Sequence, residues 1–133
     1  MTTTDIIISK AADNYRLGKS RTILTPAAAT YWVYRIPRFA LVTDVWLYVE
    51  TAGSTDTVTI GWAGNGETAQ PAGFMSATIA KVMTAGMKRA QHDSLIAWEG
   101  KYFDDASGLL TMTVGTTQTA GKFHLFISYT IIH

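Results

Sequence analysis

The stretches Thr57-Val58-Thr59-Ile60-Gly61 and Thr111-Met112-Thr113-Val114-Gly115 repeat one pattern, in which threonine alternates with an apolar residue. Alternation with a period of two places successive side chains on opposite faces of an extended strand, as a half-buried β-sheet requires. Threonine suits the solvent face, because its branched Cβ favours extended backbone and its hydroxyl tolerates water. The two stretches therefore predict two strands, each buried on its apolar side.

Each stretch is joined by a turn of small residues to a longer alternating segment. We expect the first stretch to form a β-hairpin with a strand over 39–50, and the second to form one with a strand over 122–132. The apolar face of the last strand carries Phe123, Leu125, Ile127, Tyr129 and Ile131. In the strand over 39–50 the odd positions are mostly aliphatic, and we expect them to face the core.

Further strands are expected over 5–9, 31–36 and 95–103, with at most one short helix near residues 74–87. Seven or eight short strands at regular intervals predict an all-β fold, an antiparallel two-sheet sandwich that is jelly-roll-like. An immunoglobulin-like sandwich is the second choice, although the Cys…Trp…Cys pattern of antibody domains is absent.

The 133 residues predict one β-sandwich domain over 31–133, preceded by an extended segment or arm over 1–30. The first thirty residues contain few large apolar groups. Such a segment either lies over the surface of the fold or reaches a neighbouring subunit.

Composition excludes several classes of protein. Cysteine is absent, so there is no disulfide scaffold, no thiol nucleophile and no thiolate zinc site. Eleven basic and ten acidic residues leave a net charge of +1, which predicts no nucleic-acid partner. No apolar run approaches the roughly 20 residues that span a bilayer, and no signal segment is recognisable, so we expect no membrane and a chain made in a cytoplasm.

No catalytic, cofactor-binding or metal-ligating constellation is found. The histidines, His92, His124 and His133, lack the close spacing of metal ligands. Asp104-Asp105 precedes small residues and is better explained as a turn than as an acid–base pair. The glycine-rich run over 64–67 lacks the Lys-Ser/Thr ending of a phosphate-binding loop.

Aromatic side chains are the most informative candidates for function. Trp46, Tyr48 and Phe126 should share the face opposite the aliphatic one, and Trp32 and Tyr34 should add to a similar surface. Contiguous exposed aromatic area marks a contact site. The alternatives are that residues 1–30 cover this face, or that it stacks on sugars with help from two acidic side chains, Asp44 and Glu50.

Five segments together resemble small structural proteins of tailed bacteriophages. They are Val45–Ala52, Asp56–Gly61, Gly73–Ser76, Ala85–Lys88 and the closing segment from Gly108 to Tyr129. The likeness covers roughly residues 40–130.

The resemblance implies a jelly-roll decoration (cement or auxiliary head) protein, without enzymatic activity, on the outer surface of the capsid in the virion. Its partners would be copies of itself, as a homotrimer, and the major capsid protein or another virion protein. The subunit or capsid interface would then hold Trp32, Tyr34, Trp46, Tyr48 and Phe126. The alternative is a receptor- or glycan-binding β-sandwich of a phage tail or fibre, or a carbohydrate-binding module.

Overall fold

The computed structural model describes residues 15–90, 100–104 and 107–132. Within these ranges the chain forms ten strands. They are β1 (Tyr15–Lys19), β2 (Ile23–Leu24), β3 (Ala29–Ile36), β4 (Ala40–Thr51), β5 (Val58–Gly64), β6 (Gln70–Met75), β7 (Gly86–Arg89), β8 (Lys101–Phe103), β9 (Gly108–Val114) and β10 (Lys122–Ile131).

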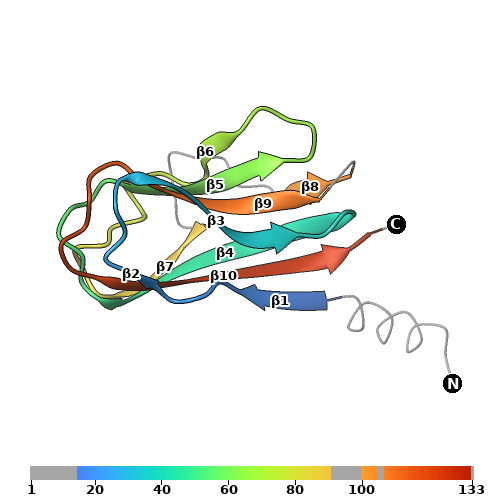
Figure 1. Cartoon of the computed structure of the whole chain (residues 1–133). Helices are drawn as coiled ribbons and strands as arrows, with labels where there is room; N and C mark the ends of the chain where they lie inside the picture. The colour runs from blue at the N-terminus through green and yellow to red at the C-terminus, as the bar shows by residue number, and fades with distance from the viewer. Residues whose placement is uncertain (1–14, 91–99, 105–106, 133) are drawn as a thin grey trace, which may run out of the picture.

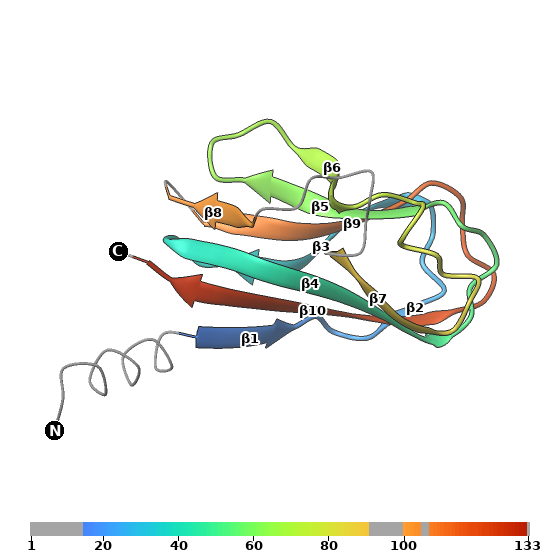
Figure 2. The same cartoon turned by 180° about the vertical axis from the view of Figure 1, so that it is seen from behind.

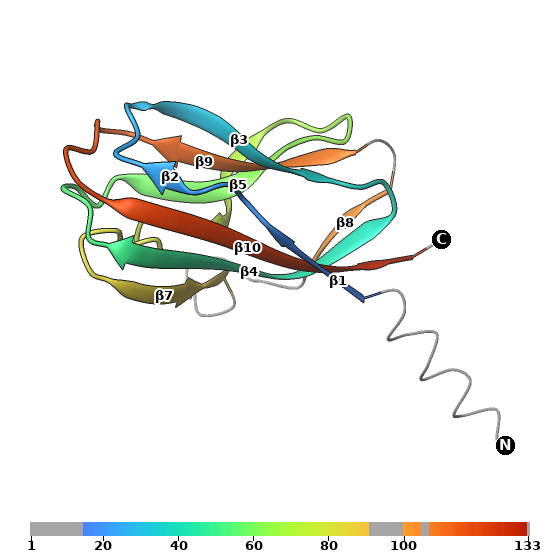
Figure 3. The ribbon, with the colours of Figure 1, turned by 60° about the horizontal axis from the view of Figure 1, so that its bottom comes forward.

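The strands form two stacked antiparallel sheets (Figures 1 and 2). One sheet has six strands in the order β1-β10-β4-β7, with β2 also paired to β10 and β8 to β4. The other has four strands in the order β3-β9-β5-β6. Figure 3 shows the two longest strands, β10 and β4, side by side through the middle of the six-stranded sheet. The predicted all-β antiparallel sandwich is confirmed.

Both predicted hairpins are wrong in their pairing. β4 and β5 lie in different sheets, as do β9 and β10, so each short connection crosses from one sheet to the other. The two repeated stretches instead pair with each other as β5 and β9, and the long strands pair as β4 and β10. Period-two alternation predicts which face a strand buries but not which strand it pairs with.

The two crossing connections, over 52–57 and 115–121, are held together by a buried glutamine. The side-chain amide of Gln118 accepts hydrogen bonds from the backbone of Ser54 and Thr55 and donates one to the carbonyl of Thr55. These backbone groups have left the sheets, and Gln118 replaces the ladder partners that they lack.

The apolar faces of the repeated stretches meet the core as expected. Val58 lies opposite Val114 and Ile60 lies opposite Met112, and all four side chains are buried. Thr59 lies opposite Thr113 on the outer face of the four-stranded sheet. Along β10, three of the predicted apolar residues, Phe123, Leu125 and Ile127, are fully buried.

β4 departs from simple alternation. Val45, Leu47 and Val49 face the core as predicted, but Val42 is buried as well. The pairing with β10 shifts register between Ser128 and Tyr129, so the strand buries even positions before the shift and odd positions after it.

The short helix predicted near residues 74–87 is absent from the structure. Phe74 and Met75 complete β6, turns follow over 76–85, and β7 begins at Gly86. The turns anchor buried Val82, whose carbonyl accepts a 2.6 Å hydrogen bond from the backbone of Gly53. Burying single side chains from a turn does not require helical spacing.

The described part of the predicted N-terminal segment lies against the six-stranded sheet. β1 and β2 pair with β10, and buried Ser20 between them bonds to the backbone of Leu125. Residues 1–14, including the strand expected over 5–9, lie outside the described residues. So does the first part of the strand expected over 95–103, of which Lys101–Phe103 forms β8. The domain division at residue 30 stays a prediction.

Candidate interaction surface

The outer face of the six-stranded sheet presents one row of side chains across four strands. Phe126 of β10 lies between Lys19 of β1 and Trp46 of β4, and Arg89 of β7 completes the row. This face points away from the core, because the alternate positions on β4 and β10 supply the buried aliphatic residues.

A shallow apolar groove of about 220 Å³ lies along this row, lined by Leu17, Trp46, Met87 and Phe126. Leu17 and Met87 are 67% and 57% exposed, while the two aromatic residues between them are half-buried. Side chains this apolar and this exposed, contiguous over four strands, make this groove the candidate contact surface. We call these four residues the outer groove.

Cations border the outer groove. The Lys19 Nζ lies 5.9 Å from the centroid of the Phe126 ring, and the Arg89 guanidinium lies 5.8 Å from that of Trp46. Arg89 is also ion-paired to Asp44, a carboxylate only 2% exposed at the register shift of β4. Contacts of cations with ring faces hold the aromatic side chains in place.

The other end of this face holds a polar cluster. Tyr48 stacks on His124 with ring centroids 5.8 Å apart. Glu50 accepts from Lys122 Nζ at 2.9 Å and lies 3.0 Å from His124 Nε2. The hydrogen bond from Lys122, followed by that from His124, lowers the pKa of Glu50.

These pairings weaken one alternative. Asp44 and Glu50 were the two carboxylates expected to grip sugar hydroxyls beside the aromatic face. The first is buried against Arg89 and the second is engaged by two neighbours. Neither carboxylate is therefore free to bind a sugar hydroxyl beside the aromatic residues.

The structure divides the five predicted interface residues among three places. Trp46, Tyr48 and Phe126 share the outer face of the six-stranded sheet, as expected. Trp32 instead lies on the outer face of the four-stranded sheet and is 71% exposed. Tyr34 packs against the core, so the structure does not bring it together with Trp32 on one outer face.

The difference at β3 comes from a register shift between Trp32 and Tyr34 in its pairing with β9. The shift turns Tyr34 toward the core, where its hydroxyl lies 3.1 Å from that of Tyr129. Burial, with this hydrogen bond, raises the pKa of Tyr129 to about 12.

Leu17 and Met87 were missed by the sequence analysis. Leu17 lies in the segment predicted as an arm, and Met87 in the segment where a helix was considered. The only signal was a large apolar residue next to a glycine in each case, Gly18 and Gly86, which is too common to single out a surface.

The remaining chemical candidates lie only partly within the described residues. Among the described residues, no three acidic or histidine side chains gather as metal ligands. The run over 64–67 forms a turn, in which the Glu67 amide donates to the Gly64 carbonyl and the Glu67 side chain pairs with Lys101. His92, Asp105 and His133 lie outside the described residues.

No helix in the described part of the chain is long and apolar enough to cross a membrane.

The fold is shared with chains of two solved phage capsids. A chain of the cyanophage Pam1 capsid asymmetric unit superposes with a TM-score of 0.62 at 17% identity, covering 90% of this chain and 86% of that one. A chain of the acidic stable capsid structure of Helicobacter pylori bacteriophage KHP30 superposes with a TM-score of 0.61 at 15% identity, covering 87% and 86%. No family model and no curated protein matches the sequence. At these identities the comparison establishes a common sandwich fold over most of each chain.

Proposed function

We propose that this chain is a non-enzymatic structural protein of a bacteriophage particle, made in the host cytoplasm, and that it decorates the outer surface of the capsid as a cement protein. Its partners are copies of itself, as a homotrimer, and the major capsid protein or another virion protein. The outer groove is the observation that carries the proposal, and the shared fold with chains of two phage capsids supports it.

The outer groove offers a modest binding energy per copy. Fully burying a leucine or methionine side chain contributes about 1.5–3 kcal/mol. The exposed fractions of Leu17 (67%) and Met87 (57%) therefore offer roughly 2–4 kcal/mol together. A contact this weak holds poorly in isolation, but it suits a protein present in many copies on one shell, where simultaneous contacts multiply.

The groove is also ready for contact without rearrangement. Trp46 and Phe126 come from paired central strands, and cations hold both rings. Side chains already held in place lose little conformational entropy on binding, so more of the apolar contact contributes to affinity.

Cryo-electron microscopy of particles of the virus that encodes the chain tests the proposal. The expected map has this sandwich on the outer shell with the outer groove against a neighbouring subunit. Absence of the protein from the particle, or a groove that faces solvent, would refute the proposal.

A matched pair of variants tests the groove in solution. Leu17→Gln with Met87→Gln should weaken binding to particles that lack the protein by roughly 30-fold per contact, from the loss of about 2 kcal/mol. Met83→Gln is the control, because Met83 is also exposed but lies in the turns before β7, away from the groove. If both variants weaken binding to the particles equally, the outer groove is not part of the interface.

A second candidate function, glycan or receptor binding, is favoured by Trp32. Its largely exposed indole lies opposite Thr111 on a sheet face where the Thr30 and Thr113 hydroxyls are 3.2 Å apart. An exposed ring beside hydroxyls is suited to stacking on a sugar. A glycan array read by tryptophan fluorescence tests glycan binding, with Trp32→Ala as the control. No change in fluorescence with any glycan would refute this function.

A further inference from the structure

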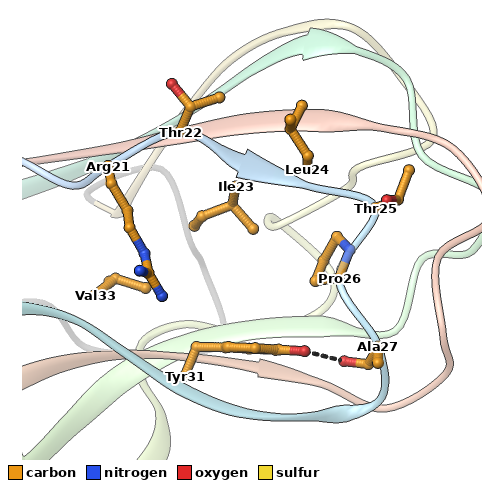
Figure 4. A pocket seen from close by; sticks show the side chains of 9 residues that line it. All are labelled: Arg21, Thr22, Ile23, Leu24, Thr25, Pro26, Ala27, Tyr31 and Val33. Carbon is orange, nitrogen blue, oxygen red and sulfur yellow. Dashed lines mark hydrogen bonds between the residues drawn. The ribbon is translucent and has the colours of Figure 1, made fainter.

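A second recess lies apart from the outer groove, where the edge of each sheet is open. It is a cleft of about 360 Å³ lined by residues 21–27, which connect β1 to β3 and include β2, and by Tyr31 and Val33 of β3 (Figure 4). β2 belongs to the six-stranded sheet and β3 ends the order of the four-stranded sheet, so the cleft opens between the layers.

The cleft combines an apolar floor with one cation. Ile23 and Pro26 are buried, and Tyr31 and Val33 pack against the core. The exposed Arg21 side chain extends across the opening toward Val33 (Figure 4). No carboxylate among the described residues pairs with Arg21. An aliphatic side chain close to a carboxylate would satisfy both features.

The backbone beside the cleft is suited to an extended ligand. β3 pairs only with β9 among the described strands, so its other edge is open over eight residues. An open edge of this length accepts an added strand through main-chain hydrogen bonds. The Tyr31 hydroxyl donates to the Ala27 carbonyl at 2.7 Å and holds the connecting loop beside this edge.

The chain itself contains a segment with the matching chemistry. Asp5-Ile6-Ile7-Ile8-Ser9 places one carboxylate directly before three β-branched aliphatic residues, which favour extended backbone. We propose that this segment from a second copy of the chain adds to the open edge of β3, with Asp5 paired to Arg21 and isoleucine side chains in the cleft. The inference deepens the proposed self-association by naming its contact.

Chain length favours a second copy over the same copy. Tyr15 begins β1 at the end of the sandwich opposite β2 (Figure 1), and six extended steps from Tyr15 to Arg21 span about 20 Å. The six steps from Ser9 to Tyr15 reach at most about 22 Å, and a reversal of direction would use part of that length. With Asp5 at Arg21 and the isoleucine side chains deeper in the cleft, Ser9 would have to lie farther from Tyr15 than Arg21 does. The segment 5–9 of the same copy would therefore fall short of the cleft.

The contact would also determine the type of assembly. The segment and the cleft are different surfaces, so each copy gives one and receives one, and such a head-to-tail contact closes into a ring when the rotation allows. A homotrimer is one such ring.

Charge exchange in the full chain tests the pairing, with self-association measured by sedimentation velocity. Asp5→Arg and Arg21→Asp should each raise the dissociation constant of self-association about tenfold, and the double variant should restore it to within about threefold. Lys81→Asp makes the same charge change at an exposed site away from the cleft and should have no effect. Single variants without effect, or a double variant no better than either single one, would overturn the pairing.

Introduced cysteines test the contact between copies, because the chain has none of its own. Ile7→Cys protein mixed with Val33→Cys protein should form a disulfide-linked pair under mild oxidation. Mixing it with Trp32→Cys protein should not, because Trp32 lies on the opposite face of the same strand. Equal linkage with both would overturn the inference.

The two proposals fail separately. Copies that associate without Ile7–Val33 linkage would refute this contact and leave the virion role standing. Linkage in a protein that is absent from phage particles would refute the virion role and support this contact.

Discussion

Replacement of Gln118 by alanine tests the connection between the two sheets most directly. Gln118 is 2% exposed. Its Oε1 accepts from the Ser54 amide at 2.8 Å and the Thr55 amide at 3.1 Å, and its Nε2 donates to the Thr55 carbonyl at 2.8 Å. Alanine would remove these three bonds, together with those to the Ser54 and Thr55 hydroxyls, and leave a cavity between the crossing connections.

The magnitude follows from the groups left without partners. A buried polar group that loses its hydrogen bond costs about 1–3 kcal/mol. Ser54 and Thr55 are half-buried, so water would replace part of each bond, and a total of about 3 kcal/mol is expected for the three groups and the cavity. For a chain of this size, that loss lowers the melting temperature by roughly 10 °C.

Urea unfolding followed by tryptophan fluorescence measures the loss, with Thr119→Ala as the control. Thr119 is exposed one residue away, and its bond to Ser54 uses its backbone amide, so alanine should cost less than about 0.5 kcal/mol. A loss below about 1 kcal/mol for Gln118→Ala would show that the connections do not depend on this side chain.

Three other predictions concern separate contacts. Gly61→Ala should cost about 2–3 kcal/mol in urea unfolding, because its Cβ would lie 1.8 Å from the Gln70 carbonyl oxygen on β6. The hydrogen bond from Lys122 lowers the pKa of Glu50 in the folded chain, so the ionised side chain adds to the free energy of unfolding above the pKa of a free glutamate. This stabilisation is lost as the pH falls through the lowered pKa. Urea unfolding at several pH values should therefore show a smaller loss of stability in acid for Glu50→Gln. The pKa of Tyr129 is raised to about 12, so the free energy of unfolding should fall as the pH rises from about 10 toward that value. Tyr129→Phe should reduce this loss of stability in alkali, and tyrosinate absorbance should show one late-titrating hydroxyl fewer.

Each of these has a clear contrary result. Wild-type stability for Gly61→Ala would mean that β6 does not lie against β5 at this point. An unchanged acid profile for Glu50→Gln would mean that the ion pairs of the polar cluster contribute nothing to folding. If Tyr129→Phe lost stability in alkali to the same extent as the parent protein, the hydroxyl responsible for that loss would not be that of Tyr129.

The sequence predicted the strands and their buried faces better than their partners. Alternation in β5, β9 and β10 identified the residues that face the core, because burial on one face imposes a period of two. Pairing depends on contacts between residues far apart in the chain. The short connections favoured local hairpins, whereas the buried position of Gln118 inside two crossing connections could not be read from spacing.

The candidate surface was predicted in its centre and missed at its edges. Trp46 and Phe126 lie on regular parts of long strands, so their shared face followed from alternation. Tyr34 was misplaced because a register shift precedes it in β3, and such shifts change the face of every later residue. Trp32 lies on a different outer face because β3 pairs with β9 in the four-stranded sheet. Leu17 and Met87 lie on strands of five and four residues, too short for a period to be recognised.

This division between centre and edge has a physical consequence for the outer groove. Its aromatic floor belongs to β4 and β10, whose opposite faces form the core, so substitutions there alter folding and binding together. Its rim belongs to β1 and β7, where Leu17 and Met87 are largely exposed and change little in the fold when replaced. The choice of partner is therefore expected to depend on the rim. Variation of Leu17 and Met87 should alter what the surface binds while the free energy of unfolding stays within about 0.5 kcal/mol.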